Sequence, residues 1–382
     1  MTVSQFGGSS MKKRTILIMS ASIGAGHVKA AEAIRNELSA RFPEDRIRML
    51  DFMDRRISVF HWMLKKLYLF MLDFVPNLYD VFYHVAGGAS GGTFARQIAA
   101  AAMYFPMARI IRHHRPDLLI CTHPFPEGAA ALWKSRHRED LVLAAVLTDY
   151  SLHQIWIYRQ VDIFFTATEE MRSGLLNMGF PEDAVHSCGI PIIPPDPRPG
   201  ERGKIRDEMG IEGDACVLLL MGGGLGLGGI ENTLDELEQM DRPLTLLIVA
   251  GHNKKLYARI MERAKISRHD LRVWSYTQEI PKLMRAADLL ITKPGALTIS
   301  EAFCAGLPML LHEPIPGPET ENAIYAEEHG AAVWVHRGES PAGELKRILE
   351  TPGLLKRMGE NAVKCGKPYS VKDIVHHIAD LC

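Results

Sequence analysis

Strand-like apolar runs alternate with helical stretches along most of the chain, and this alternation restricts the fold more than any other feature. The first half contains the runs TILIMS (residues 15–20), IRMLDF (47–52), DLLICT (117–122) and LVLAAVLTDY (141–150), with helical stretches such as VKAAEAIRNEL (28–38) between them. The pattern is typical of βαβ units that build a parallel sheet. The sequence therefore predicts an α/β protein.

A proline-rich stretch, GIPIIPPDPRPGERG (residues 189–203), interrupts this alternation. Such a density of proline excludes a helix, so we expect a linker between two domains here. The strand-like runs then start again with VLLLMGGG (217–224), TLLIVAG (245–251), LRVWSY (271–276), DLLITKPG (288–295) and PMLLHE (308–313). A chain of 382 residues also exceeds what one core usually organises. We predict two similar α/β domains that face each other across a cleft.

Composition and charge exclude several classes of protein. A net charge of −1 gives no whole-chain argument for nucleic acid. The six cysteines are scattered without a C-x-x-C pair, so neither a zinc site nor a disulfide framework is indicated, and a reducing cytosol fits best. The polar start MTVSQFGGSS lacks the apolar core of a signal peptide, and no apolar run reaches the roughly 18 residues of a membrane span. We expect any membrane contact to be peripheral.

Three strand-like runs end in loops of small residues: MSASIGAGH (19–27), MGGGLGLGG (221–229) and TKPGALT (292–298). Ligands of open α/β sheets bind at such strand ends. One glycine-rich loop alone is weak evidence, because glycine serves any tight turn. Three of them in two tandem domains indicate a nucleotide site.

Two common nucleotide motifs fit these loops poorly. In the first loop Lys29 stands where a dinucleotide fingerprint has its third glycine, and Asp51 comes late for a ribose-binding acid. An NAD-type site therefore stays only as a weak alternative. The pair Gly366 and Lys367 is followed by proline rather than serine or threonine, which argues against a P-loop.

The third loop continues as KPGALTISEA (293–302), where two readings remain open. Thr298 and Glu301 have the spacing of a capping box at a helix start. The same turn fits an anion site, because the first amides of a helix and the positive end of its dipole attract phosphate. Glu301 would then accept hydrogen bonds from ribose hydroxyls. Further on, PIPGPETENA (314–323) offers Glu319 and Asn322 either to sugar hydroxyls or to a solvated loop.

Together these segments resemble the family of processive diacylglycerol glucosyltransferases and monogalactosyldiacylglycerol synthases. The resemblance rests on ILIMSASIGAGHVKAAEAI, LTDYSLHQIWIYRQVDIFFTATEEM, CGIPI, and DLLITKPGALTISEAFCAGLP through PIPGPETENA. It implies a GT-B fold of two Rossmann-like domains. Residues 11–198 would form the lipid-acceptor domain, 199–365 the UDP-sugar-binding domain, and 366–382 a helix that crosses back to the first domain.

Carried over position by position, the resemblance implies a UDP-glucose or UDP-galactose donor and a diacylglycerol acceptor. No metal ion or other cofactor is implied, because loop amides and a helix dipole would stabilise the leaving UDP. Thr277 is expected beside uracil, Glu301 at the ribose, and Glu319 with Asn322 at the sugar. The diphosphate would be lined by Gly223, Gly224, Pro294, Gly295, Ala296 and Thr298. Ala296 departs from bacterial members, which often carry a second glycine there, yet alanine also suits a small-residue turn.

Inverting transfer needs a group that removes the proton of the acceptor hydroxyl. His27 is the first candidate, because it lies on a Gly-x-Gly-His turn at a strand end and an imidazole is neutral and basic at cytosolic pH. Capping its helix or donating to phosphate are the alternative roles for His27. Asp149 is the second candidate, either as the base or as the partner that orients a histidine. For His153 and Trp156, in the same block, a structural role is at least as well supported.

The segment 55–85, RRISVFHWMLKKLYLFMLDFVPNLYDVFYHV, mixes basic and aromatic side chains. Such a mixture, with Trp62, Lys65, Lys66 and Phe70, is typical of an interfacial helix on an anionic membrane surface, although a hairpin packed on the sheet has a similar pattern.

We predict an inverting glycosyltransferase that is peripheral on the inner, cytoplasmic face of the cell membrane and makes a β-glycosyl diacylglycerol. An epimerase of UDP-N-acetylglucosamine type and a non-catalytic UDP-sugar sensor are the alternatives. The sequence does not distinguish glucose from galactose, nor does it give the number of sugars added.

Overall fold

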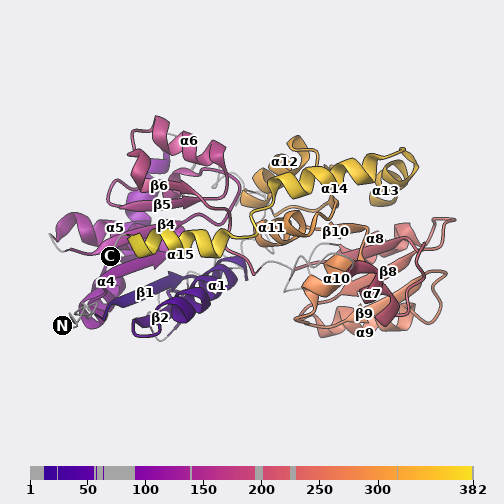
Figure 1. The fold of residues 1–382 in the computed structure, drawn as a ribbon, viewed down its shortest axis with the longest axis horizontal. Coiled ribbons are helices and arrows are strands. Elements are labelled where there is room, and N and C mark those ends of the chain that lie inside the picture. The colour runs from indigo at the N-terminus through magenta and orange to yellow at the C-terminus, as the bar shows by residue number, and fades with distance from the viewer. Residues whose placement is uncertain are drawn as a thin grey trace, which may run out of the picture.

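The chain forms two six-stranded parallel sheets, one from each half, with helices between the strands (Figure 1). The structure is a computed structural model that describes residues 13–23, 25–55, 57, 63, 91–137, 140–193, 201–223, 229–315 and 317–380. Two parallel sheets with interleaved helices confirm the predicted α/β fold of two Rossmann-like domains. Parallel strands need helical crossovers, which is the physical reason that the alternation of runs was informative.

The first sheet has the strand order β2-β1-β3-β4-β5-β6. Its strands are β1 (Thr15–Ser20), β2 (Arg46–Asp51), β3 (Leu118–Cys121), β4 (Val142–Val146), β5 (Ile163–Thr166) and β6 (Val185–Ser187). The accompanying helices are α1 (Gly26–Arg41), α4 (Gly91–His114), α5 (Pro124–Arg136) and α6 (Glu169–Asn177), with short 3-10 turns η1 (Gln154–Trp156) and η2 (Glu182–Ala184). Strands β5 and β6 are absent from the sequence-based prediction.

Alternate side chains of the first sheet enter two separate cores, as the two-residue period of a strand requires. On one face Ile16 and Ile18 of β1 pack with Ile34 of α1. On the other face Leu17 packs with Met107 of α4, and α5 lies on this side as well. Both faces are buried, so the strands read as continuous apolar runs rather than as an alternating pattern.

The second sheet has the order β12-β11-β10-β7-β8-β9. Its strands are β7 (Val217–Met221), β8 (Thr245–Val249), β9 (Asp270–Trp274), β10 (Leu289–Thr292), β11 (Met309–Leu311) and β12 (Ala332–Trp334). The helices of this half are α7 (Glu201–Glu208), α8 (Ile230–Leu237), α9 (Lys254–Arg263), α10 (Ile280–Ala286), α11 (Ala296–Ala305), α12 (Pro318–Glu328), α13 (Pro341–Glu350) and α14 (Leu354–Cys365). Strand β12, three residues long, is likewise absent from the prediction.

The two halves share one apolar core. One face of the second sheet packs under α8, α9, α13 and α14 in a core of its own. The opposite face, with Leu219 and Leu290 against Phe303 of α11, belongs to the same hydrophobic cluster as Leu17 of the first sheet. The halves are therefore packed against each other through apolar side chains, in addition to the chain that connects them.

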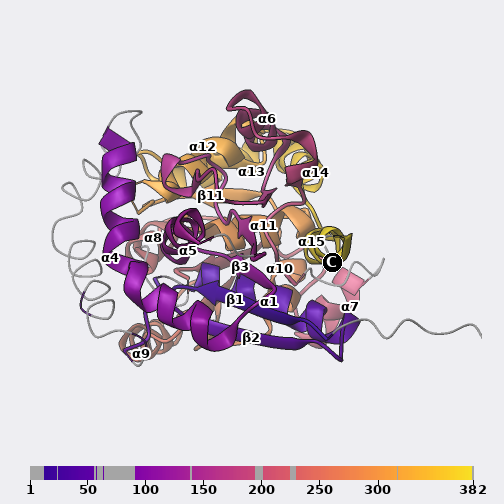
Figure 2. The same ribbon diagram turned by 90° about the vertical axis from the view of Figure 1, so that its left-hand side faces the viewer.

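The last helix, α15 (Ser370–Asp380), returns to the first half and lies beside α1 in both views (Figures 1 and 2). Its Ile374, Val375 and Ile378 are fully buried in the core under β1 and β3. The chain thus passes between the halves twice, and the two passages lie close together. A Cβ on Gly189, whose φ is +88°, would lie only 2.5 Å from Cβ of Lys367.

Candidate active site

Residues from both halves meet at the carboxyl ends of the two sheets. In the first sheet β1 lies between β2 and β3, and in the second sheet β7 lies between β8 and β10. In each sheet the chain therefore adds strands first on one side of its first strand and then on the other side. Such switch points are where open α/β sheets bind ligands. His27 follows β1, Gly223 follows β7 and Lys293 follows β10. A Cβ on Gly26 would touch Leu297 of α11 at 3.4 Å, which brings the starts of α1 and α11 together.

The His27 ring is fixed by the ends of two neighbouring strands. Its Nδ1 lies 3.0 Å from the carbonyl oxygen of Thr122, after β3, and 2.6 Å from Oγ1 of Thr148, after β4. A carbonyl oxygen only accepts, so the geometry assigns the proton of the neutral ring to Nδ1. Nε2 is then the nitrogen that accepts a proton. Helix α1 has no side-chain cap at Ala25, so His27 does not fill the capping role.

The surroundings of His27 keep its imidazole neutral. Burial lowers the pKa of His27, while the nearby Asp149 carboxylate and the Thr122 carbonyl oppose that shift. His123, whose ring centre lies 4.6 Å from that of His27, has a pKa far below its usual range because it is buried and faces His27. Its Nδ1 accepts from the amide of Phe125 and caps α5. A neutral His27 beside a carboxylate is the arrangement of a general base.

Asp149 lies close enough to His27 for each group to shift the pKa of the other. Burial raises the pKa of Asp149, and His27, a hydrogen bond from Asn322 and His153 act against that rise. Both predicted base candidates are therefore in one place, and they form a pair in which the carboxylate stabilises the imidazolium. His153 caps η1 by accepting from the amide of Ile155, and Trp156 is buried, so both have structural roles here.

The capping-box reading of Thr298 and Glu301 is wrong. Helix α11 begins at Ala296, its N-cap is Gly295, and no side chain caps its first turn. The turn after Pro294 starts the helix three residues earlier than the capping box requires, so Thr298 already lies inside it. The predicted Pro294, Gly295 and Ala296 thus form an uncapped helix start that points at the switch point between β7 and β10, which suits an anion.

Sequence reasoning missed Lys293, the residue that supplies positive charge at this turn. Its Nζ forms an ion pair with Glu319, and the two side chains are only 17% and 14% exposed. Gly223, with φ of +70°, makes room for it, since a Cβ there would lie 3.2 Å from Cε of Lys293. Gly224, predicted to line the same site, lies outside the described residues. The signal for Lys293 was its place directly after a buried strand and before the turn.

Glu301 faces the first half from the second turn of α11. Burial raises its pKa, and Lys29 of α1 acts in the opposite direction, so the pair brings opposite charges together across the interdomain face. Thr298, one turn earlier, is half-buried. Both lie on the helix that starts at the proposed phosphate turn, which is compatible with the expected ribose contact.

Replacing Glu301 by alanine is expected to weaken UDP binding by about 1.5 to 3 kcal/mol, the scale of a hydrogen bond to a charged group. Calorimetry with UDP and with 2′-deoxy-UDP separates a ribose contact from a general loss of fold. If Glu301 accepts from the 2′-hydroxyl, the wild type prefers UDP and the variant binds both nucleotides equally. An unchanged preference, with a lower melting temperature, would contradict the ribose contact.

The remaining donor residues occupy two regions. Glu319 accepts from the amide of Ile315 in addition to its ion pair with Lys293. Asn322 is fully buried, with Oδ1 accepting from the amide of Tyr150 and Nδ2 donating to the carbonyl of Pro294. Asn322 therefore bridges the two halves here, and its amide is not directed to solvent.

Thr277 lies in a separate region. It follows β9, three strands from β10, so about 14 Å of sheet edge separate it from the phosphate turn at about 4.8 Å per strand.

Asp51, the weak candidate for an NAD ribose acid, has a local role. One of its carboxylate oxygens accepts from the amides of Ser22 and Met53, both at 3.0 Å. This carboxylate organises the loop after β1, which is the loop that carries His27. The NAD alternative gains nothing from the structure.

Two family models match the chain, one in each half. The monogalactosyldiacylglycerol (MGDG) synthase model matches residues 27–192, and the glycosyltransferase family 28 C-terminal domain model matches residues 218–362. The chain is similar to MGDG synthases in its first half and to family 28 glycosyltransferases in its second half. It is therefore a glycosyltransferase, and the matched ranges contain His27, Asp149 and the turn at Lys293.

Curated relatives match the chain over nearly its whole length. Processive diacylglycerol beta-glucosyltransferases from Bacillus pumilus and Bacillus cytotoxicus are 27% and 29% identical, and the matches cover 96% and 97% of this chain and 95% and 94% of the relatives. The enzyme of that name from Bacillus subtilis is 28% identical over 91% of this chain and 90% of its own.

Solved structures agree on the GT-B fold of the chain. MurG of Acinetobacter baumannii has a TM-score of 0.63 at 16% identity, covering 96% of this chain and 99% of its own. HepE of Anabaena, in complex with UDP-glucose, has a TM-score of 0.55 at 16% identity, covering 96% and 98%. MnaA of S. aureus, solved with UDP, reaches 0.60 at 13% identity, covering 97% and 98%. Identities this low carry the fold and not the reaction.

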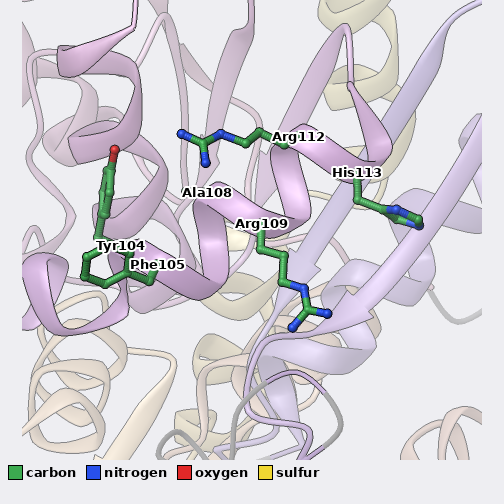
Figure 3. A pocket seen from close by; sticks show the side chains of 6 residues that line it. All are labelled: Tyr104, Phe105, Ala108, Arg109, Arg112 and His113. Atoms are coloured by element: carbon green, nitrogen blue, oxygen red, sulfur yellow. The ribbon is translucent and has the colours of Figure 1, made fainter.

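A separate pocket of about 560 Å³ lies along α4, and its lining residues do not include His27 (Figure 3). It is lined by Tyr104, Phe105, Ala108, Arg109, Arg112 and His113. Phe105 is 78% exposed, and Arg109 and Arg112 extend from the same helix. The predicted membrane residues Trp62, Lys65, Lys66 and Phe70 lie outside the described residues. Within the described part of the chain, no helix combines the length and apolarity that a membrane crossing requires.

Proposed function

We propose that the protein is an inverting glycosyltransferase that moves glucose or galactose from a UDP-sugar to diacylglycerol and forms a β-glycosidic bond. The similarity to MGDG synthases and to processive diacylglycerol beta-glucosyltransferases supports a diacylglycerol acceptor, since these proteins are named for that substrate. The observation that carries the proposal is the His27 ring, with Nδ1 held by the Thr122 carbonyl and Nε2 left to accept a proton beside Asp149. That ring belongs to the same interdomain face as the turn at Lys293.

In the proposed reaction the acceptor hydroxyl oxygen attacks the anomeric carbon from the side opposite to UDP. The bond between that carbon and the phosphate oxygen breaks, and its electron pair leaves with UDP. The hydroxyl proton passes to Nε2 of His27, and the Asp149 carboxylate stabilises the imidazolium that forms. Lys293 and the uncapped start of α11 stabilise the charge on the leaving diphosphate, so we propose a reaction without a metal ion.

We assign the donor groups along the edge of the second sheet. The diphosphate lies at Gly223 and at the turn from Lys293 to Thr298, the ribose at Glu301, and the hexose at Glu319. The uracil lies beside Thr277, where His252 and Tyr276 form a stacked pair with ring centres 4.2 Å apart. Tyr276 is half exposed, which leaves aromatic surface for a base to contact.

Turnover is expected to decline on the acid side only below about pH 6.5, the ordinary value for histidine. The pKa of His27 lies below its usual value, so the base stays unprotonated until the pH falls through that lowered pKa. Rates at saturating donor and acceptor between pH 4.5 and 8 check this. An acid limb centred above pH 7 would contradict a buried, neutral His27 as the base.

One experiment tests the reaction itself. Purified protein is incubated with radiolabelled UDP-glucose or UDP-galactose and diacylglycerol micelles, the lipids are resolved, and the anomeric configuration of the product is read by NMR. A labelled β-glycosyl lipid supports the proposal, and the better donor identifies the sugar. Conversion of UDP-N-acetylglucosamine without lipid would favour an epimerase. UDP-sugar binding without any product would favour a sensor.

We further propose that the enzyme is peripheral on the inner face of the cell membrane. The sequence of segment 55–85 and the α4 residues that line the pocket offer the same chemistry, aromatic side chains next to cations, which suits anionic headgroups. Phe105, Arg109 and Arg112 are the described residues that support this surface.

Replacing Phe105 by serine with Arg109 and Arg112 by glutamine is expected to reduce binding to phosphatidylglycerol vesicles by roughly 30-fold, since two cations are lost. Each cation near an anionic surface contributes about 1 kcal/mol. Vesicle sedimentation at low and high salt measures the effect. The control, Lys254→Gln with Lys255→Gln on exposed α9, changes the net charge equally and should bind as the wild type does. Equal losses in both variants would mean that charge alone, and not α4, controls binding.

A further inference from the structure

Tyr150 belongs to the first half by sequence, but its side chain is buried in the second half. The ring stacks on Tyr325 of α12, with centres 4.6 Å apart and an interplanar angle of 17°, and it meets Phe303 of α11 edge-on at 5.7 Å. Its hydroxyl lies 2.7 Å from Oγ of Ser300, and only 9% of the residue is exposed. The side chain of Tyr150 therefore packs between α11 and α12 of the second half.

The main chain of Tyr150 is held from the same side. Its amide donates to Oδ1 of Asn322 at 2.8 Å, and Nδ2 of Asn322 donates to the carbonyl of Pro294 at 3.2 Å. Asn322 also forms a hydrogen bond with the Asp149 carboxylate. The fully buried amide of Asn322 thus joins Asp149, which pairs with His27, to Pro294 of the phosphate turn.

We propose that Tyr150 and Asn322 are positioning residues that fix Asp149 and His27 relative to the donor turn at Pro294, a role that rests on the proposed function. Asp149 precedes Tyr150 directly, so fixing Tyr150 in the second half also fixes the carboxylate. His27 and Asp149 then keep their position relative to the turn at Pro294 only while Asn322 bridges the two halves.

The size of the effect follows from the geometry of group transfer. Reacting atoms must be held about 3 to 3.5 Å apart, and a misplacement of about 1 Å costs on the order of 10²-fold in rate. The contacts of Tyr150 and Asn322 between the halves are called the latch below. Their loss is expected to change turnover more than nucleotide affinity, because most groups proposed to bind UDP lie in the second half alone. A merely structural contact would change the melting temperature and leave turnover well below that temperature unaffected.

The main test compares Asn322→Leu, which keeps the size of the side chain and removes its hydrogen bonds, with the wild type. We expect kcat to fall about 10²-fold while the affinity for UDP changes by less than about threefold. The matched control is Ile348→Ala, which destabilises the second half from its separate core far from the latch. A fall in kcat no larger than that of the control at the same distance below its melting temperature overturns the proposal.

The pH profile gives a readout that a structural role would not move. The groups that face Asp149 are His27 of α1, His153 before η1 and Asn322 of α12, with His123 behind His27. Asn322 helps to keep Asp149 ionised, so its loss is expected to move the acid limb of kcat to higher pH. An acid limb that stays in place in Asn322→Leu, as it should in Ile348→Ala, overturns the link to Asp149.

A second set of variants keeps the test sharp if Asn322→Leu does not fold. Tyr150→Phe and Ser300→Ala each remove the hydroxyl contact, so each should lower kcat by a similar factor, about 3 to 10, and the double variant should be no worse than either. Multiplying losses would overturn the contact as the cause. Absence of glycolipid from the wild type would defeat the proposed function and not the latch. The latch is then judged by solution scattering, where Tyr150→Ala should enlarge the radius of gyration, and an unchanged radius overturns it.

Discussion

Replacing His27 by alanine is expected to lower kcat by about 10² to 10⁴, the usual contribution of a positioned general base. The Thr122 carbonyl holds Nδ1, so the lost atom that matters is Nε2. UDP affinity should change little, because the base acts on the acceptor. The melting temperature should also change little, since the side chain does not cap α1. Kinetics at saturating substrates, UDP calorimetry and thermal unfolding on one variant check the three quantities.

Two comparisons make the His27 result specific. Thr148→Val removes the hydroxyl 2.6 Å from Nδ1 and leaves the Thr122 carbonyl, so a loss of no more than about tenfold is expected if ring orientation depends mainly on the carbonyl. A His27 that contacts phosphate would give the reverse pattern, with UDP affinity lost and saturated turnover kept. Retained turnover and retained affinity would move the base to Asp149, which Asp149→Asn would then reveal.

Replacing Lys293 by methionine is expected to weaken UDP binding about 10- to 100-fold. A hydrogen bond to a charged group is worth about 1.5 to 3 kcal/mol, and a factor of ten corresponds to about 1.4 kcal/mol. In the structure Lys293 is paired with Glu319, so the arriving diphosphate has to compete with that carboxylate. Calorimetry with UDP, which lacks the hexose, isolates this competition from any contact of Glu319 with the sugar.

Glu319→Gln is the matched control, and its predicted effect has the opposite sign. Without the carboxylate, Lys293 is available to the diphosphate, so UDP should bind as tightly as to the wild type or more tightly. The double variant should recover stability lost in Lys293→Met, because it leaves no unpaired buried charge, yet it should not recover affinity. If the single variants lose UDP affinity equally, the ion pair is only a support for the turn.

The sequence predicted the architecture because burial on both faces makes parallel strands into continuous apolar runs. Strands β5, β6 and β12, of four, three and three residues, escaped prediction, and length alone is not the reason, since β3, β10 and β11 are as short and were predicted. The capping box at Thr298 failed for a local reason, since a spacing of three residues says nothing about where the preceding turn already starts the helix. His27, Asp149 and Glu301 came from motifs on strand ends, which keep their place whenever the sheet forms.

The contacts that join the halves could not be predicted in the same way. Tyr150 and Asn322 are 172 residues apart, and no periodicity or motif connects them. The same is true of Lys29 of α1 and Glu301 of α11, which interact electrostatically although they belong to different halves. A sequence pattern reports which surface an element buries, whereas the partner of that surface depends on the packing of the whole chain.

The return of α15 to the first half has a mechanical consequence. A single connection would let one half swivel freely about the other, but two connections that lie side by side, at Gly189 and Lys367, act as two pins on one axis. Any rotation of one half relative to the other is then restricted to an axis that passes near this pair of connections.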